Sequence, residues 1–356
     1  MNFTPFGGFS VNPTPAPPAE CIEEREVRHA FSRVGFLYTL LLLLHLGLAY
    51  GIFALLSHFA PDFAANPNAV FFYDSLPFYL LVIPTVFIAM RGVPRQTPAK
   101  IKLGAGRYAI LLCVGCFFMV AGSLVGSTVT GMIEALTHRP VSDVTDVISE
   151  ASLPLALLFV GILAPVAEEL IFRKALIDGL SRYGQGCAVL ASGLVFGLAH
   201  GNFSQCFYAF GLGLIFGYIY IKSGNLLLTV IPHAVINCAS VLLNKLVLPR
   251  LLPILEKLGE TTDPEVLLGL MEGELPALAA MSAYSFLLYG AAFFGLIFFF
   301  VSLRRIRLLP ADLFVQGEGG MPPVPLCERL SALAFGNPGA AAFLAVSVCS
   351  FVLSIL

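Results

Sequence analysis

Long apolar runs alternate with short polar segments along most of this chain. A helix needs about 20 mostly apolar residues to cross a bilayer. Eight runs reach or approach this length, at residues 34–57, 69–90, 108–134, 152–172, 187–203, 205–221, 226–246 and 281–303. A ninth apolar run at 339–356 could span, lie in the interface or re-enter. The pattern predicts an all-α fold: a polytopic membrane helix bundle of about eight transmembrane helices, possibly with a ninth, C-terminal apolar helix.

The composition agrees with a membrane protein. Hydrophobic residues make up 58% of the chain and charged residues only 12%, whereas soluble domains are about one quarter charged. The formal net charge of -2 gives no electrostatic reason to expect a nucleic-acid partner. The eight cysteines are scattered, and we interpret Cys113 and Cys116 as small packing residues inside a helix, because a redox or metal pair would not be placed there.

Basic residues gather in alternate connections between the predicted spans. They are Arg25, Arg28, Arg33, Arg91, Arg95, Lys100, Lys102, Arg107, Arg173, Lys174, Arg182, Lys222, Arg304, Arg305 and Arg307. The opposite connection, at about 250–280, is rich in Glu and Asp. Because positive charge is retained on the cytoplasmic side, this asymmetry predicts a multi-pass protein of the cell membrane whose N-terminus is cytoplasmic.

Ionisable groups inside membrane spans are costly and usually functional. In this chain they concentrate in three stretches, which read APVAEELIFR, VFGLAHGN and IPHAVIN. The polar residues of these stretches are Glu168, Glu169, Arg173, His200, His233 and Asn237. Elsewhere we interpret His45 as a packed or pore-facing histidine, and Asp74 and Glu134 as interfacial acids.

Helix geometry separates the three charges of the first stretch. Glu169 and Arg173 are four residues apart, so they share a face and can pair. Glu168 lies about 140° from Arg173 around the axis and has no counter-ion on its own helix. Pro165 removes a backbone hydrogen bond just upstream. Either all three charges form one stabilising cluster, or Glu169 and Arg173 are a scaffold and Glu168 is free to react.

Depth in the membrane brings the stretches together. Glu168 precedes Gly184 by 16 residues and His200 follows it by 16, so an antiparallel hairpin turning there places both at one depth. His233 and Asn237 are four residues apart and share a face of a later helix.

A carboxylate, two imidazoles and a carboxamide suit hydrolysis. A carboxylate and a neutral histidine can activate a water, while a second histidine and an asparagine can donate hydrogen bonds to an oxyanion. The GxSxG and HExxH motifs are absent. Glu168, His200 and His233 could also supply three zinc ligands, so a zinc-dependent hydrolase remains an alternative.

The motifs carry a family resemblance. EELIFR fits EExxxR, FGLAH fits FxxxH and HAVIN fits HxxxN, in this order on successive helices. Over about residues 150–245 the chain resembles the CAAX-protease and bacteriocin-processing (CPBP, or Abi) family of intramembrane glutamic endopeptidases. The resemblance implies an eight-helix membrane bundle with a cavity open to the cytosol. It also implies that Glu168 and His200 activate the water, that His233 and Asn237 form the oxyanion site, and that Glu169 and Arg173 support them.

We therefore expect an endopeptidase that cleaves membrane-associated protein or peptide substrates within the lipid bilayer, with no cofactor and no metal. A non-enzymatic transporter or scaffold is the second alternative. The expected segments are a disordered, polar cytoplasmic segment at 1–33, membrane helices at 34–149, a catalytic core at 150–246, a non-cytoplasmic loop with amphipathic helices at 247–280, a transmembrane helix at 281–303, a cytoplasmic linker at 304–338 and the apolar segment 339–356.

Overall fold

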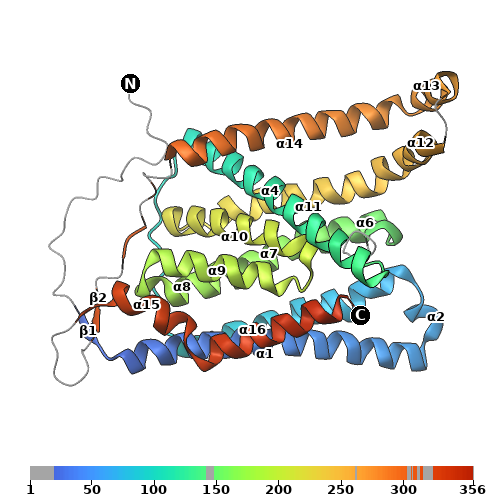
Figure 1. The fold of residues 1–356 in the computed structure, drawn as a ribbon. Helices are drawn as coiled ribbons and strands as arrows, with labels where there is room; N and C mark the ends of the chain where they lie inside the picture. The colour runs from blue at the N-terminus through green and yellow to red at the C-terminus, as the bar shows by residue number, and fades with distance from the viewer. Residues whose placement is uncertain are drawn as a thin grey trace.

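A computed structural model describes most of the chain as a bundle of long helices lying roughly side by side (Figure 1). The described residues are 20–141, 148–260, 263–302, 306, 308–310, 313–315 and 324–355. Residues 1–19 of the segment predicted to be disordered (1–33) and the basic residues Arg304, Arg305 and Arg307 lie outside them, whereas 20–33 belongs to a strand and to the start of a helix.

Seven helices of the described chain are long and apolar enough to cross a membrane, which confirms a polytopic, multi-pass helical bundle. They run over Glu24–Phe59 (α1), Pro67–Gly92, Ala105–Thr137 (α4), Leu153–Tyr183, Phe203–Ser223 (α10), Leu227–Leu258 and Leu275–Ser302 (α14). Three of these spans contain shorter helical segments. The span Pro67–Gly92 contains α3 (Ile83–Ala89), and the span Leu153–Tyr183 contains α6 (Leu153–Ala156), α7 (Ala164–Glu168) and α8 (Leu176–Leu180). The third consists mainly of α11 (Leu227–Leu242) and α12 (Leu248–Glu260). Short helices α2 (Pro61–Ala64) and α13 (Pro264–Gly273) lie in the connections.

The predicted span 187–203 differs from the others. It forms α9 (Gln185–Ala199), which has only 15 residues. Gly184, with φ 116°, precedes the helix, and Gly201, with φ 66°, follows it. Both backbone conformations favour glycine and stop a helix. This span is therefore shorter than its apolar run predicts.

The C-terminal apolar run packs on the first helix. It forms α16 (Pro338–Leu353), which is bent by 46° from α15 (Leu326–Phe335), and the pair together is long enough for an eighth span. Figure 1 shows α16 lying along α1. A Cβ added at Gly35 would collide with the backbone of Gly339, so the two helices approach at glycines.

A small sheet joins the two ends of the described chain. Strand β1 (Glu20–Ile22) pairs in parallel with β2 (Leu313–Val315), and β2 pairs antiparallel with β3 (Val324–Pro325). The segment before α1 is thus tied to the segment before α15.

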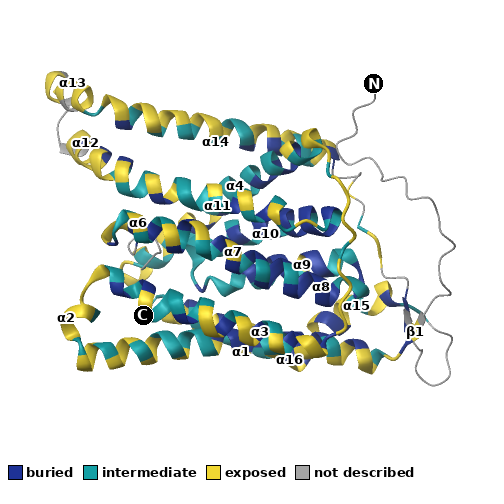
Figure 2. Ribbon diagram, turned by 180° about the vertical axis from the view of Figure 1, so that it is seen from behind, coloured by how far each residue is buried: buried dark blue, intermediate teal, exposed yellow. Residues whose placement is uncertain are grey.

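Burial is concentrated in the centre of the bundle. Figure 2 shows buried residues gathered on α8, α9 and α10, while the outer helices such as α14 expose many apolar side chains, as helices that face lipid must. Asp178 of α8 is buried and accepts hydrogen bonds from Thr97, Lys174 and Tyr220 at 2.7–3.0 Å. These bonds tie the end of the Leu153–Tyr183 span to α10.

Glycine packing between α1 and α16 makes a testable prediction. Gly35→Ala should lower the free energy of unfolding by about 1–3 kcal/mol, because the new methyl group forces the helices apart. Gly47→Ala is the matched control on the same helix, since a Cβ there meets no atom within 4 Å. Thermal unfolding in detergent measures both variants. Equal melting temperatures would contradict the close approach at Gly35.

Candidate active site

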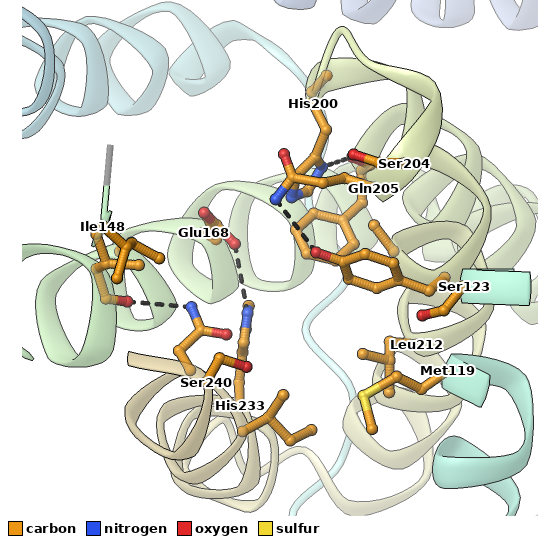
Figure 3. Close-up of a pocket in the computed structure, with 18 of the residues that line it drawn as sticks. Met119, Ser123, Ile148, Glu168, His200, Ser204, Gln205, Leu212, His233 and Ser240 are labelled. Carbon is orange, nitrogen blue, oxygen red and sulfur yellow. Dashed lines mark hydrogen bonds and ion pairs between the residues drawn. The ribbon is translucent and has the colours of Figure 1, made fainter. Parts of the chain in front are cut away.

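One cavity of about 950 Å³ contains all four predicted catalytic residues. Glu168 comes from α7, His200 from the end of α9, and His233 and Asn237 from α11. In Figure 3 the labelled side chains of Glu168, His200 and His233 point toward one another from three different helices. The hairpin predicted around Gly184 therefore does bring Glu168 and His200 into one space.

Pro165 opens the helix that carries Glu168. The residues before it, Leu157–Leu163, form π-helical turns, in which each carbonyl pairs with the amide five residues on. For Val160 that partner would be Pro165, which has no N–H. The Asn237 Nδ2 atom donates to the Val160 carbonyl at 3.1 Å and replaces the missing bond. Asn237 thereby holds α11 against the span of Glu168.

A second proline shows the same arrangement. Pro232, directly before His233, cannot donate to the Leu228 carbonyl of α11. The hydroxyl of Tyr108, on α4, donates to this carbonyl at 2.9 Å. In both irregular helices of the cavity, a side chain from a neighbouring helix thus donates to the carbonyl that the proline leaves without a partner. Backbone polar groups inside a membrane need such partners.

The predicted pair of Glu169 and Arg173 is confirmed. The Arg173 Nε atom lies 3.2 Å from Glu169 Oε2, and neither side chain is exposed. The guanidinium also lies 4.4 Å from the ring centre of Phe196 and 5.8 Å from that of Phe216, positions in which aromatic faces stabilise a cation. Neither residue lines the cavity, so a substrate in the cavity does not reach the two charges.

His233 connects this pair to Glu168. Its Nδ1 lies 3.0 Å from Glu169 Oε1, and its Nε2 lies 3.5 Å from Glu168 Oε2. The Glu169 carboxylate is paired with Arg173, so it accepts a hydrogen bond from His233 Nδ1. Nδ1 therefore carries a proton, and this bond fixes the orientation of the ring. Glu168 has no counter-ion on its own helix, as expected, but it has this partner on α11, which spacing within one helix does not predict.

A backbone carbonyl fixes the orientation of the His200 ring. Its Nδ1 lies 2.8 Å from the carbonyl oxygen of Phe196. A carbonyl only accepts, so Nδ1 donates and Nε2 is left with its lone pair. Asn202, the N-cap of α10, donates to the His200 carbonyl at 3.0 Å and fixes the turn. A histidine with a free Nε2 lone pair beside a cavity is suited to accept a proton from water.

Two further ionisable residues line the cavity. His45 Nε2 lies 3.3 Å from Asp74 Oδ1, and both residues line the cavity. His45 is pore-facing, as one of its two interpretations held, but it is not isolated, and Asp74 belongs to the cavity wall. The contact joins α1 to the next span, and no local motif links residues so far apart on different helices.

The zinc alternative requires three or more ligands close together. Within the described part of the chain, no group of three or more His, Cys, Asp or Glu side chains is arranged to hold a metal ion. Glu168, His200 and His233 share a cavity without forming such a group.

Comparison with known proteins gives the class. Residues 150–239 match the family model described as type II CAAX prenyl endopeptidase Rce1-like. The chain is 26% identical over 176 residues to the membrane-embedded CAAX protease MroQ of Staphylococcus aureus (strain USA300). It is 23% identical over 166 residues to the putative membrane peptidase YdiL of Bacillus subtilis (strain 168).

These alignments cover 46% and 45% of this chain, and 70% and 66% of the two relatives. No solved structure matches the chain. The matched region contains the EExxxR, FxxxH and HxxxN motifs, and the resemblance to CAAX proteases is confirmed. The helical bundle and the family match together define a membrane endopeptidase.

The buried pair predicts a stability effect. Arg173→Ala leaves Glu169 buried without its counter-ion, which should cost about 3–5 kcal/mol of stability and lower protein yield as well as activity. Arg250→Ala is the control, because this arginine is 61% exposed and lies 3.8 Å from Glu274. Yield and melting temperature measure both variants. An Arg173→Ala protein that is as stable as wild type, yet inactive, would contradict the supporting role.

Proposed function

We propose that this membrane endopeptidase hydrolyses peptide bonds of membrane-associated proteins or peptides with a water activated by Glu168 and His200. The observation that carries the proposal is the convergence of four polar side chains from three helices on one cavity. The likeness to a protein named as a CAAX protease supports a peptide bond as the substrate. We also propose a cell-membrane location with a cytoplasmic N-terminus.

Water activation uses two acceptors of the site. The Glu168 carboxylate and the His200 Nε2 lone pair both belong to the cavity wall. Together they position a water and accept its proton as it attacks the scissile carbonyl carbon. Glu168 then returns that proton to the leaving amine. No covalent intermediate with the enzyme is formed.

The oxyanion of the tetrahedral intermediate is stabilised by His233 and Asn237. The Asn237 amide has two hydrogens, and only one is needed for the Val160 carbonyl. The second is available to the oxyanion. His233 already donates to Glu169 through Nδ1, so its Nε2 can donate to the same oxyanion only when the ring is an imidazolium, in exchange for its 3.5 Å contact with Glu168. Glu169, held by Arg173, keeps the His233 ring in place.

The two water-activating residues give the first functional test. Glu168→Gln and His200→Ala should each lower kcat by about a hundredfold or more, because the general base is lost. Glu134→Gln is the control, since this carboxylate is outside the cavity and bonds the backbone of Val141. Cleavage of a membrane-anchored peptide by purified protein measures the rates. If both active-site variants retain wild-type proteolysis, the proposed mechanism fails.

Asn237 gives a second test, with a different signature. Asn237→Ala should lower kcat by about a hundredfold and change KM little, because an oxyanion donor acts in the transition state. Ser240→Ala is the control, because Ser240 lines the cavity one turn away on α11. Melting temperatures check that the loss of the Val160 bond has not unfolded the site. A rise in KM at unchanged kcat would contradict the oxyanion role.

A further inference from the structure

The catalytic cavity continues past the four residues to a second polar pair. His45 of α1 and Asp74 of the π-helical turn Phe71–Ser75 lie 3.3 Å apart in its wall. Both precede the family-matched region, which begins at residue 150. Their side chains are 26% and 38% exposed, so a molecule in the cavity can reach them. The mechanism proposed above does not use them.

The pair shares its cavity with the catalytic residues. Tyr79, which donates to the Phe159 carbonyl at 2.9 Å, lines the same cavity. The ring of Phe78 meets the imidazole of His45 edge-on at 5.0 Å and limits its rotation. The pair is therefore oriented and open to the cavity.

The wall carries no lysine or arginine. Among the described residues that line the cavity, the acidic groups are two carboxylates and the basic groups are three imidazoles. A carboxylate with an imidazole carries a charge of about −1 when the imidazole is neutral and about zero when it is protonated. The pair therefore attracts a cation when the imidazole is neutral. In a site partly closed to water this attraction is stronger than at a surface.

The far wall of the cavity is different. There α4 contributes Met119, Val120 and Leu124, with Ser123 and Ser127, and α14 contributes Leu288. In both ribbon views α1 lies on one side of α7, α9 and α11, and α14 lies on the other, while Figure 1 shows α4 crossing the bundle diagonally from the end of α14. A peptide that crosses the catalytic residues thus has one flank beside His45 and Asp74, and the other beside apolar side chains and hydroxyls.

We propose that His45 and Asp74 form a substrate subsite that binds a lysine or arginine side chain on one side of the scissile bond. Asp74 supplies the charge, and His45 holds the carboxylate in place through Oδ1. The opposite flank of the substrate meets apolar side chains and hydroxyls. This inference rests on the proposed endopeptidase function and adds to it a preference for substrates with a basic residue near the cleavage point.

Three quenched-fluorescent peptide series test the subsite. All carry one apolar membrane anchor, and a single Lys, norleucine or Glu is moved through the positions on each side of the cleavage point. The full-length protein in lipid nanodiscs should prefer Lys over norleucine about tenfold in kcat/KM at one position, on one flank only. Glu at that position should be the poorest substrate.

Variants assign the preference to the pair. Asp74→Asn should reduce the ratio of Lys to norleucine cleavage to about one, whereas His45→Gln should keep it, because the carboxylate remains. Asp62→Asn, which removes an exposed acid of α2 outside the cavity, should change neither rate. The ratio separates recognition from a general loss of folded protein, which lowers both rates together.

The outcomes are distinguishable. A ratio near one in wild type, or an Asp74→Asn ratio equal to that of wild type, overturns the subsite while leaving the endopeptidase intact. If Asp74→Asn does not fold, the wild-type position profile and the His45→Gln ratio decide the question alone. Failure of wild type to cleave any peptide of the three series would instead contradict the proposed function.

Discussion

The guanidinium of Arg173 lies inside a membrane helix with none of its surface exposed, so its charge must be balanced by neighbouring side chains. Glu169 supplies that balance one helical turn away, and its second oxygen contacts His233 on α11. His233 in turn reaches Glu168, the carboxylate of the cavity. A requirement of stability thereby fixes the ring on which the proposed oxyanion site depends, and the loss of the arginine would disturb every later contact.

Two prolines impose a related constraint on the backbone. Each leaves a carbonyl without its helical donor in a region where water is scarce. Asn237 donates a hydrogen bond to the carbonyl of Val160, and Tyr108 donates one to the carbonyl of Leu228. The bonds cross between helices, so the kinks that widen the cavity also lock its walls together. Asn237 consequently serves the fold with one amide hydrogen and is free to serve the chemistry with the other.

Patterns within one helix, or within one hairpin, were readable from the sequence. The apolar runs predicted the bundle, the four-residue spacing predicted the pair of Glu169 and Arg173, and equal distances from Gly184 predicted that Glu168 and His200 meet. Contacts between distant helices were not readable, because periodicity carries no information about which faces pack. His233 beside Glu168, His45 beside Asp74 and α16 against α1 are all of this kind. The helix predicted at 187–203 ends earlier, at Ala199, because Gly201 adopts a positive φ within the apolar run.

The central claim is that a peptide bond is held between a water-activating side and an oxyanion-binding side of one cavity. A structure of the Glu168→Gln protein with a bound, anchored peptide tests it most directly. The account predicts the scissile carbonyl oxygen within hydrogen-bond distance of His233 Nε2 and Asn237 Nδ2, and a water between its carbon, Gln at position 168 and His200. A peptide bound elsewhere, or a carbonyl oxygen directed away from His233 and Asn237, would contradict it.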